Sequence, residues 1–182
     1  MEMILAEILP PTQIPYPIIF ARLLGAILFG AILGFEREVK ARPAGLKTHI
    51  LVSLAAALFA IISIVSSHMP GLADEQVRID PLRVIEAVTA GVAFLAAGTI
   101  IMSRGRVLGL TTGASLWLAG AIGLATGMGY WPFAAFVVVV AFAVLTLVSV
   151  AEHRYRDKSE PHLKPESSEI EDRRREEEPS AA

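Results

Sequence analysis

The chain of 182 residues contains no cysteine. Disulfide bonds, thiolate metal sites and thiol nucleophiles are therefore excluded, whereas the redox state of its compartment is left open. Common catalytic signatures are missing as well: there is no His-Glu-x-x-His, no Gly-x-x-x-x-Gly-Lys-Ser/Thr and no Gly-x-Ser-x-Gly. We expect no enzymatic activity, no cofactor, no metal site and no nucleic acid partner.

Charge is scarce through most of the chain. The segment 152–182 holds 7 of the 16 Lys and Arg and 10 of the 18 Asp and Glu, which leaves 9 and 8 for residues 1–151. Hydrophobic residues make up 54% of the chain, the mean hydropathy is +0.57, and the apolar residues form continuous blocks. Because a soluble domain has about 45–50% apolar residues arranged in stripes, lipid is the expected solvent.

Five apolar blocks are long enough to cross a bilayer as helices. A block of about 20 residues extends ~30 Å, the thickness of one hydrocarbon core. Prolines interrupt the lead 1–15, and the charged segment 152–182 has too few apolar residues to fold, so we expect a disordered cytoplasmic tail there. The sequence predicts an all-α membrane protein with a transmembrane domain at 16–151 and five transmembrane helices, at about 16–35, 46–66, 81–102, 107–128 and 132–150.

The distribution of basic residues predicts the orientation. Cytoplasmic loops of membrane proteins carry an excess of Lys and Arg. With the N-terminus outside and the C-terminus inside, Arg78 and Arg83 fall outside, and the inner side receives nine basic residues: Arg37, Lys40, Arg42, Lys47, Arg104, Arg106, Arg154, Arg156 and Lys158. We therefore expect a multi-pass protein of the inner (plasma) membrane with the N-terminus out.

Charges concentrate in one stretch of the hydrophobic part, residues 36–49. Its lysines are explained by orientation and by contact with anionic lipid. Carboxylates contribute nothing to orientation, so the acidic residues and the Pro-Ala-Gly turn need another role. A histidine at the start of a helix could respond to protons, although such a residue more often only bonds a neighbour. The functional candidates here are Glu36, Arg37, Arg42, Thr48 and His49.

Three further ionisable residues, Arg22, Arg83 and Glu86, lie within the predicted spans. A charge at mid-helix costs about 2.5–3.5 kcal/mol by insertion scales, so each should face protein or a cavity. Arg22 and Glu86 fall at comparable depth, and we predict that they meet, directly or through Arg83. A structural ion pair and a functional site are equally good explanations.

Small residues at four-residue spacing predict close helix packing. Glu86 shares a helix face with Ala90, Ala93 and Ala97, and three Gly-x-x-x-Gly pairs occur in the blocks 16–35 and 107–128. We therefore expect the blocks 16–35, 81–102 and 107–128 to form a tight cluster. The predicted packing residues are Gly30, Gly34, Ala90, Gly109, Gly113, Gly123 and Gly127.

Polar side chains also mark two predicted helix starts. The hydroxyls of Thr111, Thr112 and Ser115 could line a polar path or bind an anion at a helix N-terminus. More often such hydroxyls, here Thr111 and Ser115, cap or bond their own helix. Asp80 precedes Pro81 and is explained as a helix N-cap. Any ligand role for Asp80 would be additional.

Three runs resemble the MgtC/SapB family of membrane proteins. They are residues 22–49 with Gly-Phe-Glu-Arg-Glu and Arg-Pro-Ala-Gly-Leu-Lys-Thr-His, residues 80–98 with Asp-Pro-x-Arg-Val, and residues 109–124 with Gly-Leu-Thr-Thr and Ser-Leu-Trp. The resemblance implies a bacterial inner-membrane protein of five spans linked to adaptation to low magnesium. The chain departs from the family pattern at Ala87, Ala93 and Ala96. Longer members end in a folded cytosolic domain, where this chain has its charged tail.

Two functions remain open at this point. The first is a regulator that binds another integral membrane protein or complex, with self-association as a further interaction. The second is a transporter or channel for Mg²⁺ or another ion. Magnesium prefers carboxylates and water, whereas Glu36 and Glu86 each have an arginine nearby, and five helices without a clear repeat differ from the usual transporter plan. We therefore favour regulation. A purely structural scaffold would tolerate neutralising changes at Glu36 and Arg37.

Overall fold

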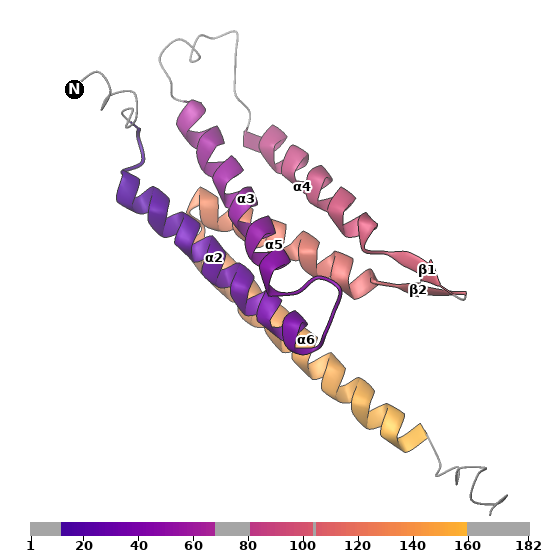
Figure 1. Ribbon diagram of the computed structural model, residues 1–182. Helices are drawn as coiled ribbons and strands as arrows, with labels where there is room; N and C mark the ends of the chain where they lie inside the picture. Colours follow the sequence, from indigo (N-terminus) through magenta and orange to yellow (C-terminus); the bar gives the residue numbers. More distant parts are fainter. Residues whose placement is uncertain (1–11, 68–80, 104, 160–182) are drawn as a thin grey trace, which may run out of the picture. The chain divides into compact units, whose positions relative to one another are not determined.

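The computed structural model describes residues 12–67, 81–103 and 105–159, in which five helices and one β-hairpin occur (Figure 1). The helices are α2 (Tyr16–Val39), α3 (Leu46–Ser66), α4 (Pro81–Gly98), α5 (Leu110–Met128) and α6 (Trp131–Ser159). The strands are β1 (Ile101–Ser103) and β2 (Arg106–Leu108). Residues up to Val144 and residues from Leu145 form two compact units. The mostly helical class is thus confirmed.

Within the described residues, three helical segments are long and apolar enough to cross a membrane: α2, α3 and residues 131–148 of α6. The bounds of α3 agree with the predicted block 46–66. Helix α5 is richer in Gly, Ala, Ser and Thr, and many of its residues are buried against other helices. Its composition therefore serves packing within the protein more than contact with lipid.

Helix α3 lies at the centre of the packing, between α2 and α5. Glycines of both neighbours touch its backbone: a Cβ at Gly30 would lie 2.8 Å from the His49 carbonyl oxygen, and one at Gly123 would lie 2.8 Å from Ser53 Cα. Gly34 and Gly127 make similar contacts with α3. The prediction of a cluster built from blocks 16–35, 81–102 and 107–128 was therefore wrong about its centre, which is the segment 46–66.

Helix α4 packs on α5 through a different face from the predicted one. Ala90, with Ala93 and Ala97, is exposed, whereas Val92 and Ala96 are buried. Val92 contacts Gly120, and the Ala96 carbonyl oxygen lies 3.2 Å from a Cβ built at Gly113. Small size alone did not identify the packing face, because the larger Val92 fits over a glycine on the partner helix.

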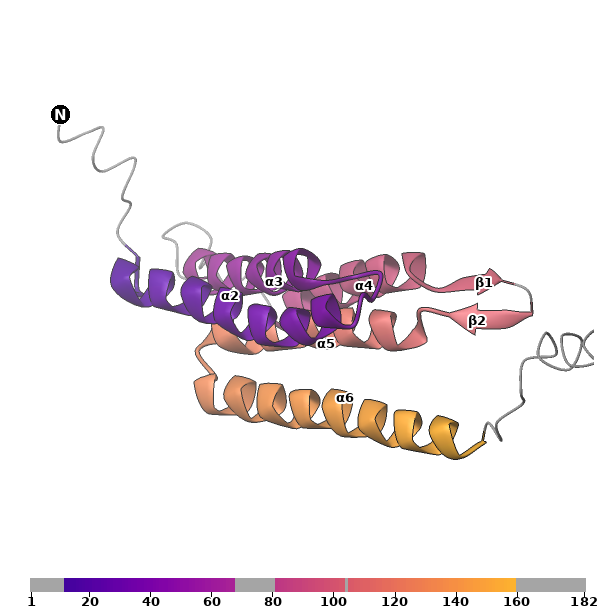
Figure 2. The same cartoon turned by 60° about the horizontal axis from the view of Figure 1, so that its bottom comes forward.

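Helix α4 ends at Gly98, before the predicted end at 102, and a β-hairpin follows (Figure 2). Thr99 Oγ1 donates to the Ala96 carbonyl at 2.7 Å, which satisfies a group left open at the helix end. The antiparallel register pairs Ile101 with Leu108 and Ser103 with Arg106. The sequence analysis predicted no strands in this part of the chain.

Gly109 is a turn residue rather than a helix-packing residue, which corrects its predicted role. It precedes α5 with φ 88°, a left-handed conformation that favours glycine. Its position against the Thr99 backbone leaves no room for a side chain. As a result α5 begins at Leu110 and not at 107.

Helix α6 continues to Ser159, past the predicted end at 150. The start of the predicted disordered tail is thus helical. The predictions for the lead at 1–11, the loop 68–80 with the N-cap Asp80, and the tail 160–182 lie outside the described residues.

Candidate functional site

The charged stretch predicted from the sequence lies where α2 ends and α3 and α5 begin. Glu36 and Arg37 in the last turns of α2 are 6% and 3% exposed. Arg37 Nε lies 3.1 Å from Glu36 Oε2, and Lys40 Nζ pairs with Glu36 Oε1. A buried carboxylate needs such partners, because an unpaired buried charge is costly. Both oxygens of Glu36 therefore form ion pairs, one with Arg37 in the last turn of α2 and one with Lys40 at its C-cap.

The α2–α3 loop (residues 40–45) is held by hydrogen bonds at the end of α2. Arg42 N–H donates to the Arg37 carbonyl and Ala41 N–H donates to the Glu38 carbonyl, both at 3.0 Å. This pattern is a Schellman motif with Ala41 in the left-handed region at φ 50°. Left-handed backbone costs a non-glycine residue about 1–2 kcal/mol. The loop thus holds a strained residue in a fixed place.

Glu38 caps the next helix. Its Oε2 accepts a hydrogen bond from Leu46 N–H at 2.9 Å, at the first residue of α3. The N-cap residue, Gly45, has no side chain to do this, and a carboxylate at a helix N-terminus is also favoured by the helix dipole. From the sequence, the acidic residues of this stretch were expected to have a role other than orientation, but Glu38 was not among the functional candidates. The signal that could have found it is a glycine N-cap, which requires a capping group from elsewhere in the chain.

His49 joins α3 to α5 from a fully buried position. Its Nδ1–H donates to the Gly45 carbonyl at 2.8 Å, and its Nε2 lies 3.1 Å from Ser115 Oγ, which is 2.9 Å from the Thr112 carbonyl. The single proton of Ser115 can go to Nε2 or to that carbonyl. When the imidazole is neutral, its Nε2 accepts the hydrogen bond from the Ser115 hydroxyl. When the imidazole is protonated, Nε2–H donates to Ser115 Oγ, and the Ser115 hydroxyl donates to the Thr112 carbonyl. The contact of Ser115 with its own helix was expected from the sequence, but its contact with His49 was not.

Removing the Ser115 hydroxyl should destabilise the protein. In Ser115→Ala the buried Nε2 of His49 loses its partner, and an unsatisfied buried polar group costs about 1–3 kcal/mol. We expect a loss of that size in the free energy of unfolding, measured in detergent micelles. Thr111→Ala is the matched control, because Thr111 is exposed and such changes usually stay within about 0.5 kcal/mol. Equal stability of the two variants would contradict the buried bond.

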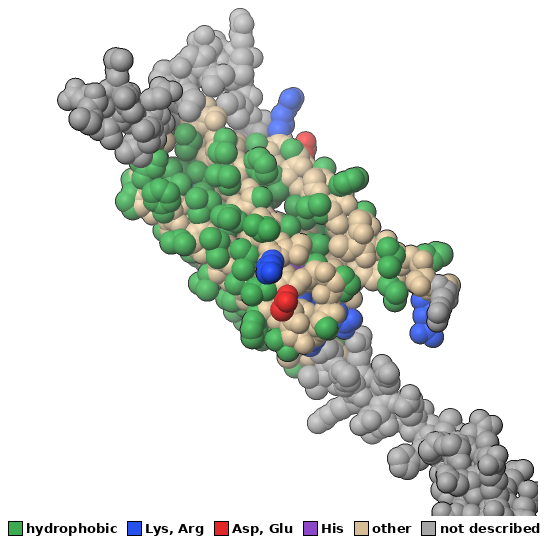
Figure 3. Space-filling view, in the orientation of Figure 1, with side chains coloured by type: hydrophobic (Ala, Val, Ile, Leu, Met, Phe, Trp, Pro, Cys, Tyr) green, Lys and Arg blue, Asp and Glu red, His purple; other side chains and the backbone are tan. Residues whose placement is uncertain are grey.

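The structure brings together only part of the predicted residues. Glu36, Arg37, His49 and Thr112 are buried around the helix ends, and Gly34 packs against His49. Arg42, Thr48 and Lys47 are exposed beside them. Figure 3 shows charged side chains in this region on a face that is otherwise largely hydrophobic. We call the residues Glu36, Arg37, Glu38, Lys40, His49 and Ser115 the loop cluster.

Arg22 has a different partner from the predicted one. Its Nη1 donates to the Gly127 carbonyl at 2.8 Å, in the last turn of α5, and it packs under Gly129. A cation at a helix C-terminus is stabilised by the free carbonyls and the dipole. Arg83 and Glu86 are exposed on α4, and among the described residues neither forms an ion pair with Arg22. Arg22 therefore belongs to helix packing and not to the loop cluster.

The chain is similar in sequence to known proteins. The model of the MgtC family matches residues 23–154. Similar proteins include the "Putative magnesium transporter YhiD" of Escherichia coli K12, which is 36% identical over 75% of this chain and 63% of the relative. "Protein SapB" of Bacillus subtilis is 39% identical over 63% of this chain and 50% of the relative. "Protein MgtC" of Brucella abortus 2308 is 38% identical over 70% of this chain and 50% of the relative.

The alignment with this chain covers between 50% and 63% of the length of these relatives. No solved structure matches it. The family match covers the loop cluster and all five described helices except for the first and last residues of the helical region. The three sequence runs, the helical fold and the family match agree, and the chain belongs to the MgtC family.

Proposed function

We propose that this protein crosses the bacterial inner membrane five times, with the N-terminus outside, and regulates another integral membrane protein. It would bind that partner through the α2–α3 loop and the first turn of α3. The family, the three candidate spans and the asymmetry of basic residues support this proposal. The family resemblance suggests low magnesium as the condition in which the regulation operates. No catalytic step is part of the proposal.

The observation that carries the proposal is the pairing of Glu36. Its two oxygens are engaged by Arg37 and Lys40. A Mg²⁺ site uses carboxylates and water in an octahedral shell, and a carboxylate already held by two cations is a poor ligand. The charges of the loop cluster are instead used to fix the loop itself.

A fixed loop is well suited to binding a protein. Arg42, Lys47 and Thr48 are exposed on this frame, and a preorganised surface loses little conformational entropy on association. Two exposed cations, Arg42 in the loop and Lys47 in the first turn of α3, favour an acidic partner surface, because charge complementarity raises the association rate and excludes wrong partners. The loop can therefore serve as the recognition surface.

Site-specific photo-crosslinking in cells tests the proposed interface. A photoreactive residue at Lys47 should capture one membrane protein, and Arg42→Glu should reduce its yield at least tenfold, as expected for losing about 1.4 kcal/mol or more of binding free energy. A probe at Phe136, which is 70% exposed on α6, is the matched control and should not capture that protein. Capture of a second copy of this chain alone, or equal yields from the two positions, would contradict the proposal.

Ion transport is the second candidate, favoured by the name of the Escherichia coli relative, "Putative magnesium transporter YhiD". It is tested with purified protein in sealed vesicles. Mg²⁺ influx above that of empty vesicles, abolished by Glu86→Ala, would replace regulation with transport as the function. Under the regulatory proposal, vesicles with and without the protein take up Mg²⁺ at the same rate.

A further inference from the structure

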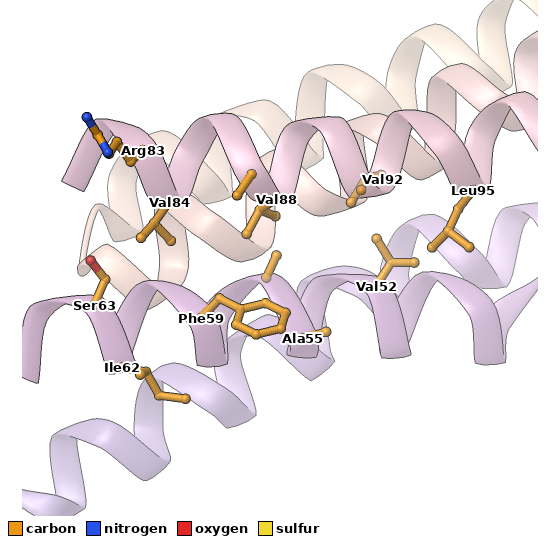
Figure 4. A pocket seen from close by; sticks show the side chains of 13 residues that line it. Val52, Ala55, Phe59, Ile62, Ser63, Arg83, Val84, Val88, Val92 and Leu95 are labelled. Atoms are coloured by element: carbon orange, nitrogen blue, oxygen red, sulfur yellow. The ribbon is translucent and has the colours of Figure 1, made fainter. Parts of the chain in front are cut away.

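A groove of about 560 Å³ lies between α3 and α4 (Figure 4). Its walls are apolar along most of its length, and Ser63 and Arg83 lie together at one end. We infer that the groove binds an anionic phospholipid of the surrounding bilayer, with one acyl chain between the helices and the phosphate at Ser63 and Arg83. This site is separate from the loop cluster and does not depend on the proposed regulatory function.

The groove exists because α4 packs on α5 more than on α3. Val92 and Ala96 hold α4 against α5, while small residues line the space towards α3. A Cβ built at Gly91 would meet no described atom within 4 Å, and Ala55 and Ala87 also line the space. An apolar space of this kind in a membrane helix bundle is filled by hydrocarbon, because water has no polar partner there.

The dimensions of the groove fit an acyl chain. On α3 the groove is lined from Val52 to Ser63, which at about 1.5 Å per residue is ~16 Å. A space of about 560 Å³ along that length accommodates one extended acyl chain.

The polar end supplies the group that selects the headgroup. Ser63 is 7% exposed, and its Oγ has no hydrogen-bond partner within the described residues. A buried hydroxyl left unpaired costs about 1–3 kcal/mol, so an acceptor brought by a ligand is favoured. Figure 4 shows the Ser63 hydroxyl and the Arg83 side chain at the same end of the groove, on opposite helices.

Arg83 adds the charge. It is exposed in the first turn of α4, and no carboxylate of the described residues lies within ion-pair distance of it. A guanidinium and a hydroxyl donor together match a phosphate diester, since arginine presents paired N–H groups to phosphate oxygens. A neutral headgroup would gain less from the same pair. The chemistry therefore points to an anionic phospholipid such as phosphatidylglycerol.

Native mass spectrometry of the purified full chain tests the inference. The protein is loaded with equal amounts of phosphatidylglycerol and phosphatidylcholine and analysed at increasing collision energy. We expect one phosphatidylglycerol per chain to be retained at least tenfold over phosphatidylcholine, the factor that corresponds to about 1.4 kcal/mol. Arg83→Gln should remove this preference. Arg106→Gln, which removes an exposed arginine in β2 instead, should keep it.

A second variant tests the position of the lipid acyl chain in the groove. Gly91→Leu fills the groove with a side chain that meets no described atom at its Cβ, so the thermal midpoint should not fall, while lipid retention should drop at least tenfold. Retention of both lipids alike, an equal effect of Arg83→Gln and Arg106→Gln, or full retention by Gly91→Leu would each overturn the inference. Retention of a fatty acid but not of phosphatidylglycerol would overturn it as well.

Discussion

The variant Glu36→Gln is expected to lose about 3–5 kcal/mol of unfolding free energy, the usual cost of removing one member of a buried ion pair. The side chain of Arg37 is 4% exposed and would keep its charge without the carboxylate. Lys40 is 28% exposed and can turn to solvent, so the main cost comes from Arg37. Chemical denaturation in detergent micelles, followed by circular dichroism, measures the change.

The matched control for this variant is Glu38→Gln, the same chemical change two residues further along. Glu38 is exposed, and glutamine keeps an oxygen that can accept the hydrogen bond from Leu46 N–H. We expect it to lose less than about 1 kcal/mol, since only the charge at the helix N-terminus is removed. If Glu36→Gln and Glu38→Gln cost the same, the buried pair does not stabilise the loop cluster as described.

The second large effect is expected from a single added methyl group. In Gly123→Ala the new Cβ would lie 2.8 Å from two backbone atoms of Ser53, and closer still to its carbonyl oxygen. Backbone in a packed helix cannot move aside as a side-chain tip can, so α5 must separate from α3. Overpacking of this kind costs about 1–3 kcal/mol and occasionally more. Separation would also disturb the Ser53 hydroxyl, which donates to the Ala26 carbonyl at 2.9 Å.

The same substitution at Gly91 is expected to have the opposite effect on stability. Its Cβ would meet no described atom within 4 Å, and alanine is about 1 kcal/mol better than glycine inside a helix. The thermal midpoint of Gly123→Ala should therefore fall and that of Gly91→Ala should stay or rise. A rise of similar size in both would show that helix propensity, not the α3–α5 contact, governs these positions.

The helices could be predicted where apolar blocks end in clear signals. The segment 46–66 is bounded by the Pro-Ala-Gly turn and by a run of serines, and its predicted bounds are those of α3. The end of α4 has no such signal. The run Ile100–Met102 is apolar and β-branched in part, and periodicity cannot separate a short strand from the end of a buried helix. The hairpin there depends on Gly105 and Gly109 in left-handed conformations.

The candidate site was predictable in its residues but not in its connections. Glu36, Arg37 and His49 could be selected because charges are rare in an apolar chain. Their partners could not, because Ser115 is 66 residues from His49 and one hydroxyl among several at the start of α5. The face of α4 was also misassigned, since which side is covered depends on the glycines of α5.

The hydrogen bonds around His49 have a consequence for biogenesis. The contacts within residues 36–49, including the bond from His49 to the Gly45 carbonyl, use only α2, α3 and the loop between them. These contacts can form as soon as α2 and α3 have entered the membrane from the ribosome. The Nε2 atom of His49 must wait for Ser115 on α5. Docking of α5 against α3 is therefore the assembly step that gives the His49 Nε2 atom its hydrogen-bond partner. In a chain stalled before α5 is synthesised, this Nε2 atom would lack the Ser115 partner.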